Sequence, residues 1–232
     1  MKDTNASAPP DMKAELLRRL GTMHEKEGDR FQAIDFYSKS LSYNEEQAEL
    51  HLELARHARS WRRHQDALKH YKTFLSMQKD QQVLLEYALT MAEAGEAELA
   101  RKLLREKLRG TPSGPPISKC YDLLEKDLTE KALNCADEHV LKQAEKYQSF
   151  LEVITFYNQL GKTAKARERA TQAYKLYANH DKVVWAYALQ HYQYGDLEKA
   201  KKAWLSLAKR SPSAELWEIL AQVAYEQDLP RE

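Results

Sequence analysis

The sequence predicts an all-α protein built from repeated helix pairs, and its composition and internal periodicity support this prediction. Charged residues make up 31% of the 232 residues and hydrophobic residues 43%, with only 7 Gly and 7 Pro. Strong helix formers dominate, and no segment is enriched in Val, Ile and Thr as strands are. The glycines and alanines also recur at a common interval, which indicates internal repeats.

The repeat has a period of about 33 to 34 residues. Four of the seven glycines follow one another at about two, two and one of these periods. These glycines are Gly28, Gly95, Gly161 and Gly195. The alanines in the same register are Ala33, Ala67, Ala100, Ala166 and Ala200. Two residue types that share one period are typical of stacked structural repeats.

Each unit has the same order of features: a first helix with apolar and small residues, a turn, and a second helix with a small residue and a large apolar one. In the first three units these positions are Leu17, Gly21, Gly28, Ala33 and Tyr37, then Leu54, Ala55, Ala67 and Tyr71, then Leu84, Ala88, Gly95, Ala100, Leu104 and Pro112. In the later units they are Phe150, Ile154, Gly161, Ala166 and Ala170, then Val184, Ala188, Gly195, Ala200, Trp204 and Pro212.

This pattern resembles the tetratricopeptide repeat (TPR) family, and the resemblance covers about residues 14 to 228. It implies a right-handed α-solenoid with about five clear repeats, one degenerate unit and a C-terminal helix. Small residues in both helices of a pair let their backbones approach closely. Gly ends the first helix because it tolerates the left-handed conformation, and a following Asp can cap the second helix.

The region between the third and fourth clear units departs from the pattern. The interval from Gly95 to Gly161 spans two periods and leaves room for one degenerate unit, after a helix-breaking stretch at 111–116. The region is either a distorted repeat, which we favour, or a joint between two halves. No clear turn signal lies between Lys142 and Gly161, so the second helix of this unit is expected to run into the next helix. The predicted organisation is a flexible tail (1–11), repeats one to three (12–112), a linker and degenerate repeat (113–146), further repeats (147–212) and a C-terminal helix (213–232).

The last predicted helix is apolar on more than one face, through residues such as Leu216, Trp217 and Tyr225. A terminal capping helix should instead have a polar outer face. We therefore expect that the chain is a piece of a larger repeat protein and that this helix is the first helix of a further repeat.

Two sets of residues are candidates for contact with a partner. The first, called the groove set, lies on the first helix of each pair, beside the residues that pack in the core. These positions should face the concave side of the stack. The groove set is Leu52, Arg56, Leu85, Leu89, Leu151, Thr155, Asn158, Trp185, Leu189 and Tyr192. Its apolar members fit an amphipathic or extended protein segment, and the alternative is that they pack against neighbouring repeats.

The second set, called the basic patch, consists of Arg59, Arg62, Arg63 and His64. Such a cluster can bind a phosphate, an acidic partner or an anionic polymer. The ordinary explanation is a solvated helix C-terminus, where cations interact well with the helix dipole.

The sequence contains no glycine-rich phosphate loop, nucleophile elbow or HExxH pair, so we expect neither an enzyme nor a cofactor. Cys120, Cys135 and His139 are a weak zinc signal because they lack a tight CxxC, and we expect no metal site. Buried apolar cysteines are the favoured interpretation, since two cysteines do not make a disulfide framework.

The function that these features predict is a non-catalytic scaffold that binds a protein or peptide in its concave groove, as the TPR resemblance implies. The alternative is a periplasmic TPR region of an exopolysaccharide secretion protein, which docks a polymer-modifying enzyme or guides a charged polymer. The net charge of +1 argues against a nucleic-acid partner. The sequence has no run of about 18 apolar residues, so we expect no membrane span in this chain. The sequence leaves the compartment open.

Overall fold

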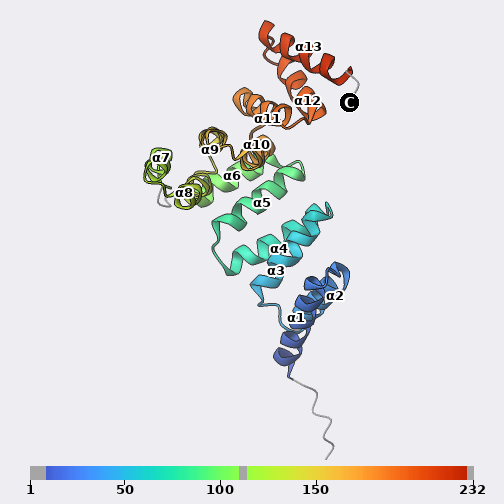
Figure 1. The fold of residues 1–232 in the computed structure, drawn as a ribbon. Coiled ribbons are helices and arrows are strands. Elements are labelled where there is room, and N and C mark those ends of the chain that lie inside the picture. The colour runs from blue at the N-terminus through green and yellow to red at the C-terminus, as the bar shows by residue number, and fades with distance from the viewer. Residues whose placement is uncertain (1–8, 110–113, 229–232) are drawn as a thin grey trace, which may run out of the picture. The chain divides into compact units, whose positions relative to one another are not determined.

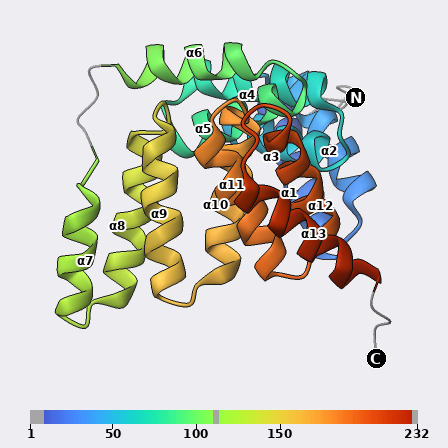
Figure 2. The same cartoon turned by 90° about the horizontal axis from the view of Figure 1, so that it is seen from above.

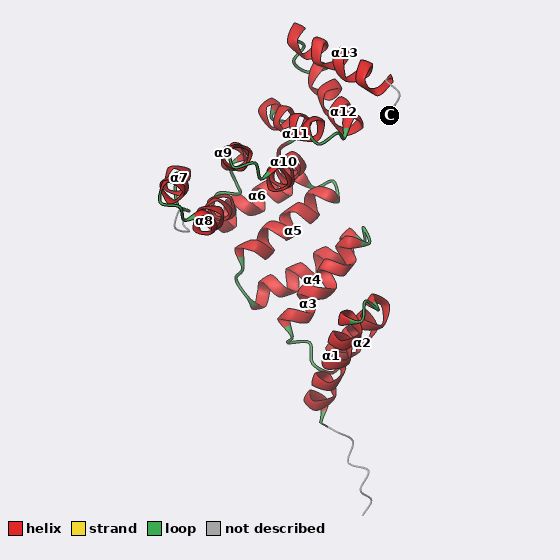
Figure 3. Cartoon of the chain, viewed as in Figure 1, coloured by secondary structure: helices red, strands yellow, loops and turns green. Residues whose placement is uncertain are grey.

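The computed structural model describes residues 9–109 and 114–228, and over these ranges the chain forms thirteen helices and no strand (Figures 1 and 3). The predicted all-α class is confirmed. Residues 1–8 of the predicted tail, residues 110–113, which include the start of the predicted break at 111–116, and the last four residues lie outside the described part. The helices are α1 (Pro10–Lys26), α2 (Arg30–Tyr43), α3 (Ala48–Ser60), α4 (His64–Met77), α5 (Gln81–Glu93), α6 (Ala97–Leu108), α7 (Ile117–Glu125), α8 (Thr129–Lys142), α9 (Tyr147–Gln159), α10 (Thr163–Tyr177), α11 (Asp181–Gln193), α12 (Leu197–Ala208) and α13 (Ala214–Asp228).

The chain divides into two compact units, residues 1–94 and 95–232. In the first unit α1 pairs with α2 and α3 with α4, and α5 packs on α4. In the second unit the pairs are α7 with α8, α9 with α10, and α11 with α12, while α13 packs on α12 and α6 on α10. The antiparallel pairs of the second unit can be followed in Figure 2. The division falls inside the predicted third repeat, and the domain boundaries predicted at 112, 146 and 212 stay predictions.

Within residues 9–109 and 114–228, six residues with positive φ mark the turns of the repeat. The four predicted glycines are among them, and the other two are Arg62 and Asp127, each with a φ of 58°. Arg62 lies midway between Gly28 and Gly95, and Asp127 midway between Gly95 and Gly161, so each turn follows the previous one after a single period. Arg62 and Asp127 therefore occupy the turn positions that glycine occupies in the other units, and the sequence pattern hid them because neither is a glycine.

Small residues allow the close packing inside each pair. All five alanines of the predicted period have no exposed surface. In α1 a Cβ added to Gly21 would lie 2.5 Å from ring carbons of Tyr37 on α2. That separation is too short for real atoms, so α1 and α2 can approach this closely only because residue 21 has no side chain.

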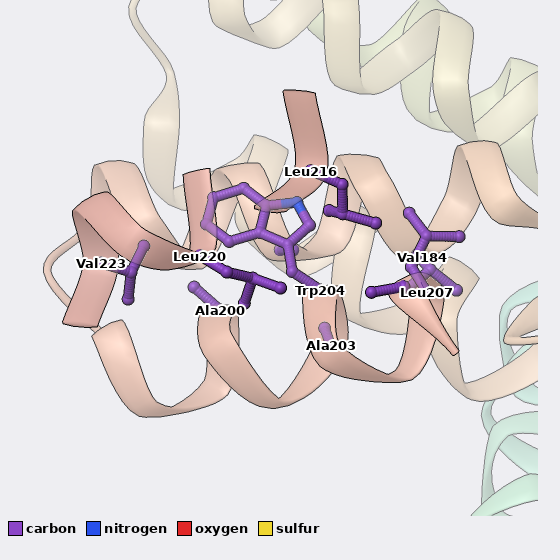
Figure 4. Close-up of a cluster of buried hydrophobic side chains, with 10 residues drawn as sticks. Val184, Ala200, Ala203, Trp204, Leu207, Leu216, Leu220 and Val223 are labelled. Carbon is purple, nitrogen blue, oxygen red and sulfur yellow. The ribbon is translucent and has the colours of Figure 1, made fainter. Parts of the chain in front are cut away.

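One core cluster of the second unit lies between its last three helices, α11, α12 and α13. Trp204 on α12 is fully buried in a cluster that includes Val184 of α11 and Leu216 and Leu220 of α13 (Figure 4). The other labelled members of this cluster are Ala200, Ala203, Leu207 and Val223. As predicted, α13 is apolar on more than one face, because Trp217 and Tyr225 are exposed by 54% and 64%.

The degenerate unit forms a helix pair, α7 with α8, and a disulfide joins them. Cys120 on α7 is bonded to Cys135 on α8, with their Cα atoms 5.5 Å apart. The expectation of two unpaired buried cysteines was therefore wrong, because helix pairing brings residues 15 apart in sequence within bonding reach. The expectation of a continuous helix through Lys142 was also wrong, since α8 ends there and α9 begins at Tyr147.

Replacing Arg62 by Gly is predicted to stabilise the chain by about 1 kcal/mol, because a left-handed conformation costs a residue with a Cβ about 1–2 kcal/mol. Asp127→Gly is the matched control and should stabilise less, since Asp tolerates this conformation better than Arg. Thermal unfolding followed by circular dichroism measures both changes. A loss of stability in Arg62→Gly would contradict the assignment.

Removing the disulfide is predicted to lower the free energy of unfolding by about 3 kcal/mol, which is the chain-entropy value for a loop of about 15 residues. The measurement is hydrogen exchange of α7 and α8 in the wild-type chain and in the double variant Cys120→Ser with Cys135→Ser. Faster exchange should be confined to this helix pair. Alkylation of both thiols by iodoacetamide without reductant would show that the bond is absent.

Candidate functional site

The first unit has a pocket between its first helices. Its volume is about 480 Å³, and its lining comes from α1, α2, α3 and the turn before α3. The lining residues are Arg18, Thr22, Glu25, Tyr37, Glu46, Gln47, Glu49, Leu50 and Glu53. Four of these nine residues are glutamates, and only one is basic. The pocket is therefore strongly acidic.

The single basic residue of the pocket is already paired. Arg18 binds Glu15 through two hydrogen bonds, from Nε at 2.7 Å and from a terminal nitrogen at 2.8 Å. Hydrogen bonds from Arg18 and Arg19 lower the pKa of Glu15 to about 2. A backbone hydrogen bond and the side chain of Gln78 lower the pKa of the pocket residue Glu49. Glu49 therefore contributes a full negative charge to the pocket at neutral pH.

Glu25 connects the three helices around this pocket. Tyr37 on α2 donates a hydrogen bond of 2.6 Å to Glu25 Oε2, and His57 Nε2 on α3 lies 3.2 Å from Glu25 Oε1. Burial and the hydrogen bond to Glu25 raise the pKa of Tyr37 to about 12, so its hydroxyl stays protonated and acts as a donor. Glu53, one turn before His57, completes a cluster in which one ligand atom of each residue lies within 4.8 Å of the others. Within the described ranges this is the cluster whose atoms could hold a metal ion.

Arginine and carboxylate pairs link successive first helices in the first unit. Arg56 on α3 binds Glu86 on α5 through two hydrogen bonds of 3.1 and 3.0 Å. One turn later, Arg59 binds Glu93 through two hydrogen bonds of 3.0 Å. Such paired bonds fix geometry as well as charge, so α3 and α5 are held in one relative position.

A related arrangement occurs in the second unit. Asp137 on α8 accepts hydrogen bonds from Tyr157 on α9 at 2.5 Å and from Arg169 on α10 at 2.6 Å. Burial acts to raise the pKa of Asp137, but the hydrogen bond from Tyr157 and the charge of Arg169 outweigh it and lower that pKa. In both units, one carboxylate, Glu25 or Asp137, accepts hydrogen bonds from side chains on the two helices that follow its own.

The residues of the groove set differ in how accessible they are: some are buried, some are held by contacts within the chain, and some are exposed. Leu85 and Leu89 are buried, with 1% and 3% of their surface exposed, so the prediction that they face a partner was wrong. Helix α5 has a wide apolar surface, and the sequence could not show which part of it the core uses. Arg56 is held by Glu86, and Leu52 packs against the core of α3 and α4.

The groove residues of the second unit are partly accessible. Thr155 and Asn158 on α9 are exposed, and Leu151 is half-buried. The aromatic members serve the core as well, since Trp185 makes an edge contact with Trp204 at 6.1 Å between ring centroids. Leu189 and Tyr192 also pack on this cluster, and the Tyr192 hydroxyl donates to Glu226 at 2.7 Å. Packing against neighbouring helices therefore accounts for the apolar character of Trp185, Leu189 and Tyr192.

Three of the four residues of the basic patch have carboxylates beside them. Arg59 is bound to Glu93 as described, and Arg63 pairs with Asp66 at 2.7 Å. His64 Nδ1 lies 3.9 Å from Glu93. Arg62 is the exposed residue of the turn. Most of the positive charge of the patch is thus balanced within the chain.

Sequence reasoning missed the acidic pocket and its Glu25, Glu53 and His57 cluster. One signal was present, because Glu53 and His57 are four residues apart and share one helix face. The third member comes from another repeat and Tyr37 from another helix, so only the folded chain brings them together.

A histidine pair lies between α3 and α4. His51 Nδ1 and His70 Nδ1 are 2.9 Å apart, so one ring donates and the other accepts. Burial lowers the pKa of both rings, and the positive charge that His51 can carry lowers the pKa of His70 further. If both rings were protonated at once, neither Nδ1 atom could accept a hydrogen bond and this bond would break.

The comparisons with known proteins concern the fold. No protein-family model matches the chain, and no curated protein matches its sequence. Among solved structures, a tetratricopeptide repeat protein from Parabacteroides merdae is 14% identical, with a TM-score of 0.43 and coverage of 96% of this chain and 87% of that chain. The pilF protein of Pseudomonas aeruginosa is 18% identical, with a TM-score of 0.40 and coverage of 93% and 100%. A thermophilic TPR protein of Thermus thermophilus is 18% identical, with a TM-score of 0.36 and coverage of 91% and 99%.

The chain's own features define its class. It has consecutive helix pairs, turn residues that recur once per period and buried small residues at fixed positions in the pairs. Its fold is a helical-repeat fold built from helix-turn-helix units of the tetratricopeptide type. Over the described ranges, none of its helices has both the length and the apolar content that crossing a membrane requires.

The histidine pair predicts that the first unit loses stability as the pH falls below about 6.5, the ordinary pKa of an unfolded histidine. The folded pKa values are lowered, so the unfolded chain binds more protons in this range and acid favours unfolding. Hydrogen exchange of α3 and α4 should accelerate toward acid once corrected for the intrinsic rate. His70→Gln should reduce this pH dependence.

His191→Gln provides the matched control for that experiment. Burial also lowers the pKa of His191, but this residue lies on α11 in the second unit. Its replacement should alter the pH dependence of α11 and α12 and leave that of α3 and α4 intact. An unchanged acid response of α3 and α4 in His70→Gln would show that the pair does not control it.

Proposed function

We propose that this chain is a non-catalytic scaffold that binds a segment of another protein along the inner faces of its first helices. The observation that carries the proposal is the acidic pocket between α1 and α3, since the core helices leave an open, charged cavity there. Concave sites with a few placed polar groups are typical of ligand binding, and repeat stacks commonly offer extended concave surfaces. The scaffold would act as part of a larger assembly.

The accessible groove residues of the second unit support the same proposal. Asn158 and Thr155 on α9 are exposed, while Trp185 and Leu189 on α11 keep part of their apolar surface accessible. Aromatic side chains that are half-buried and rigid are well suited to anchor a partner. A segment with apolar and polar residues would contact both kinds of group.

An anionic polymer is not favoured by the geometry. Arg59 and Arg63 are paired with carboxylates, and the pocket in the same unit is lined by four glutamates. A polyanion would meet this negative charge. We therefore do not extend the proposal to polymer guidance or to exopolysaccharide secretion.

Site-specific crosslinking tests the scaffold function. A photo-reactive benzoylphenylalanine is placed at Glu49 in the pocket, at Asn158 on α9, or at Lys72, which is exposed on the second helix α4. We expect the first two positions to crosslink to a protein in cells that express the chain, with Lys72 as the matched control on an outer surface. Equal crosslinking from all three positions, or none from Glu49 and Asn158, would contradict the proposal.

A further inference from the structure

We propose that Glu25, Glu53 and His57 form a binding site for a divalent transition metal ion, with zinc as the best fit. The site goes beyond the scaffold function, because it needs no protein partner. One oxygen of each carboxylate and one ring nitrogen of His57 lie within 4.8 Å of one another. Bonds of about 2.0–2.2 Å from a zinc ion to nitrogen and oxygen place neighbouring ligand atoms about 3–3.6 Å apart. Small side-chain movements close the cluster to that size.

Local structure prepares two of the three ligands. Glu53 and His57 are separated by one helical turn on α3 and therefore project from the same face. A pair at this spacing is a common way for a rigid helix to chelate a metal, because the backbone already holds both side chains together. Glu25 reaches the pair from the last turn of α1.

Tyr37 orients the third ligand. Its hydroxyl donates to Glu25 Oε2 at 2.6 Å, which leaves Oε1 directed to His57 at 3.2 Å. A hydrogen bond from a group behind a metal ligand fixes the orientation of that ligand, and removing it usually weakens metal binding. The same bond satisfies one lone pair of Glu25 in the absence of an ion.

Glu53 can move toward the other two ligands at little cost. Its side chain is 37% exposed, and its contact with Arg56 is 3.7 Å long. Arg56 makes its two short hydrogen bonds to Glu86 instead. An exposed ion pair of this kind contributes little stability, so an ion at the cluster readily replaces it.

The surroundings favour a cation with open coordination positions. Glu25 and Glu53 also line the pocket, together with Glu46 and Glu49, so the local field attracts positive charge. Three protein ligands leave at least one position of a zinc ion for water or for a group of another molecule. Imidazole suits zinc and similar ions, whereas magnesium and calcium prefer ligand sets made only of oxygen.

Isothermal titration of the full chain with zinc chloride, in metal-free buffer, tests the proposal. We expect one ion per chain and at least about tenfold weaker binding in Glu53→Gln and in His57→Gln. Tyr37→Phe should weaken binding about tenfold, because it removes only the orienting hydrogen bond. Magnesium chloride should show no comparable affinity.

Two controls keep the outcome unambiguous. Circular dichroism in the presence of a chelator must show unchanged helicity, and Glu53→Gln is the safest variant because its side chain is exposed. His70→Gln removes half of the His51 and His70 pair, in which two imidazole nitrogens of the same unit lie close together. Zinc binding that disappears in His70→Gln and persists in His57→Gln, or no saturable binding at all, would overturn the proposal.

Discussion

The close approach of paired helices is the constraint on which the rest of the structure depends. In the first pair, α1 meets α2 where Gly21 leaves no room for even a methyl group beside the ring of Tyr37. Along the chain, buried alanines such as Ala67 and Ala166 have the same role in later pairs. Because a larger side chain would separate the backbones, this spacing fixes the small residues, and their recurrence once per repeat is the visible result.

Polar contacts then join adjacent helix pairs within each unit. The carboxylate of Glu25 binds Tyr37 on α2 and approaches His57 on α3, while Asp137 binds Tyr157 on α9 and Arg169 on α10. In each case one acidic side chain joins three helices from two adjacent pairs. Within each unit, the contacts that join adjacent helix pairs therefore also determine where these charged side chains lie.

The second unit shows how a weak repeat is maintained. The helix α7 has only nine residues, the shortest among the described helices, and its turn uses Asp127 instead of glycine. The Cys120 and Cys135 disulfide joins this short helix to α8. A covalent link limits the freedom of the unfolded loop, which offsets the small apolar contact area of a short helix.

The sequence by itself determined the helical class, the repeat period and the buried alanines, because spacing along one chain directly encodes which residues share a helix face. It did not determine that Leu85 and Leu89 are buried while Thr155 and Asn158 are exposed, since a helix with a wide apolar surface does not reveal which part its neighbours cover. Tertiary structure also decided that the turn at Arg62 needs no glycine and that Cys120 meets Cys135. The acidic pocket and its Glu25, Glu53 and His57 cluster combine side chains from different helices, and no pattern local in sequence can report a distance between helices.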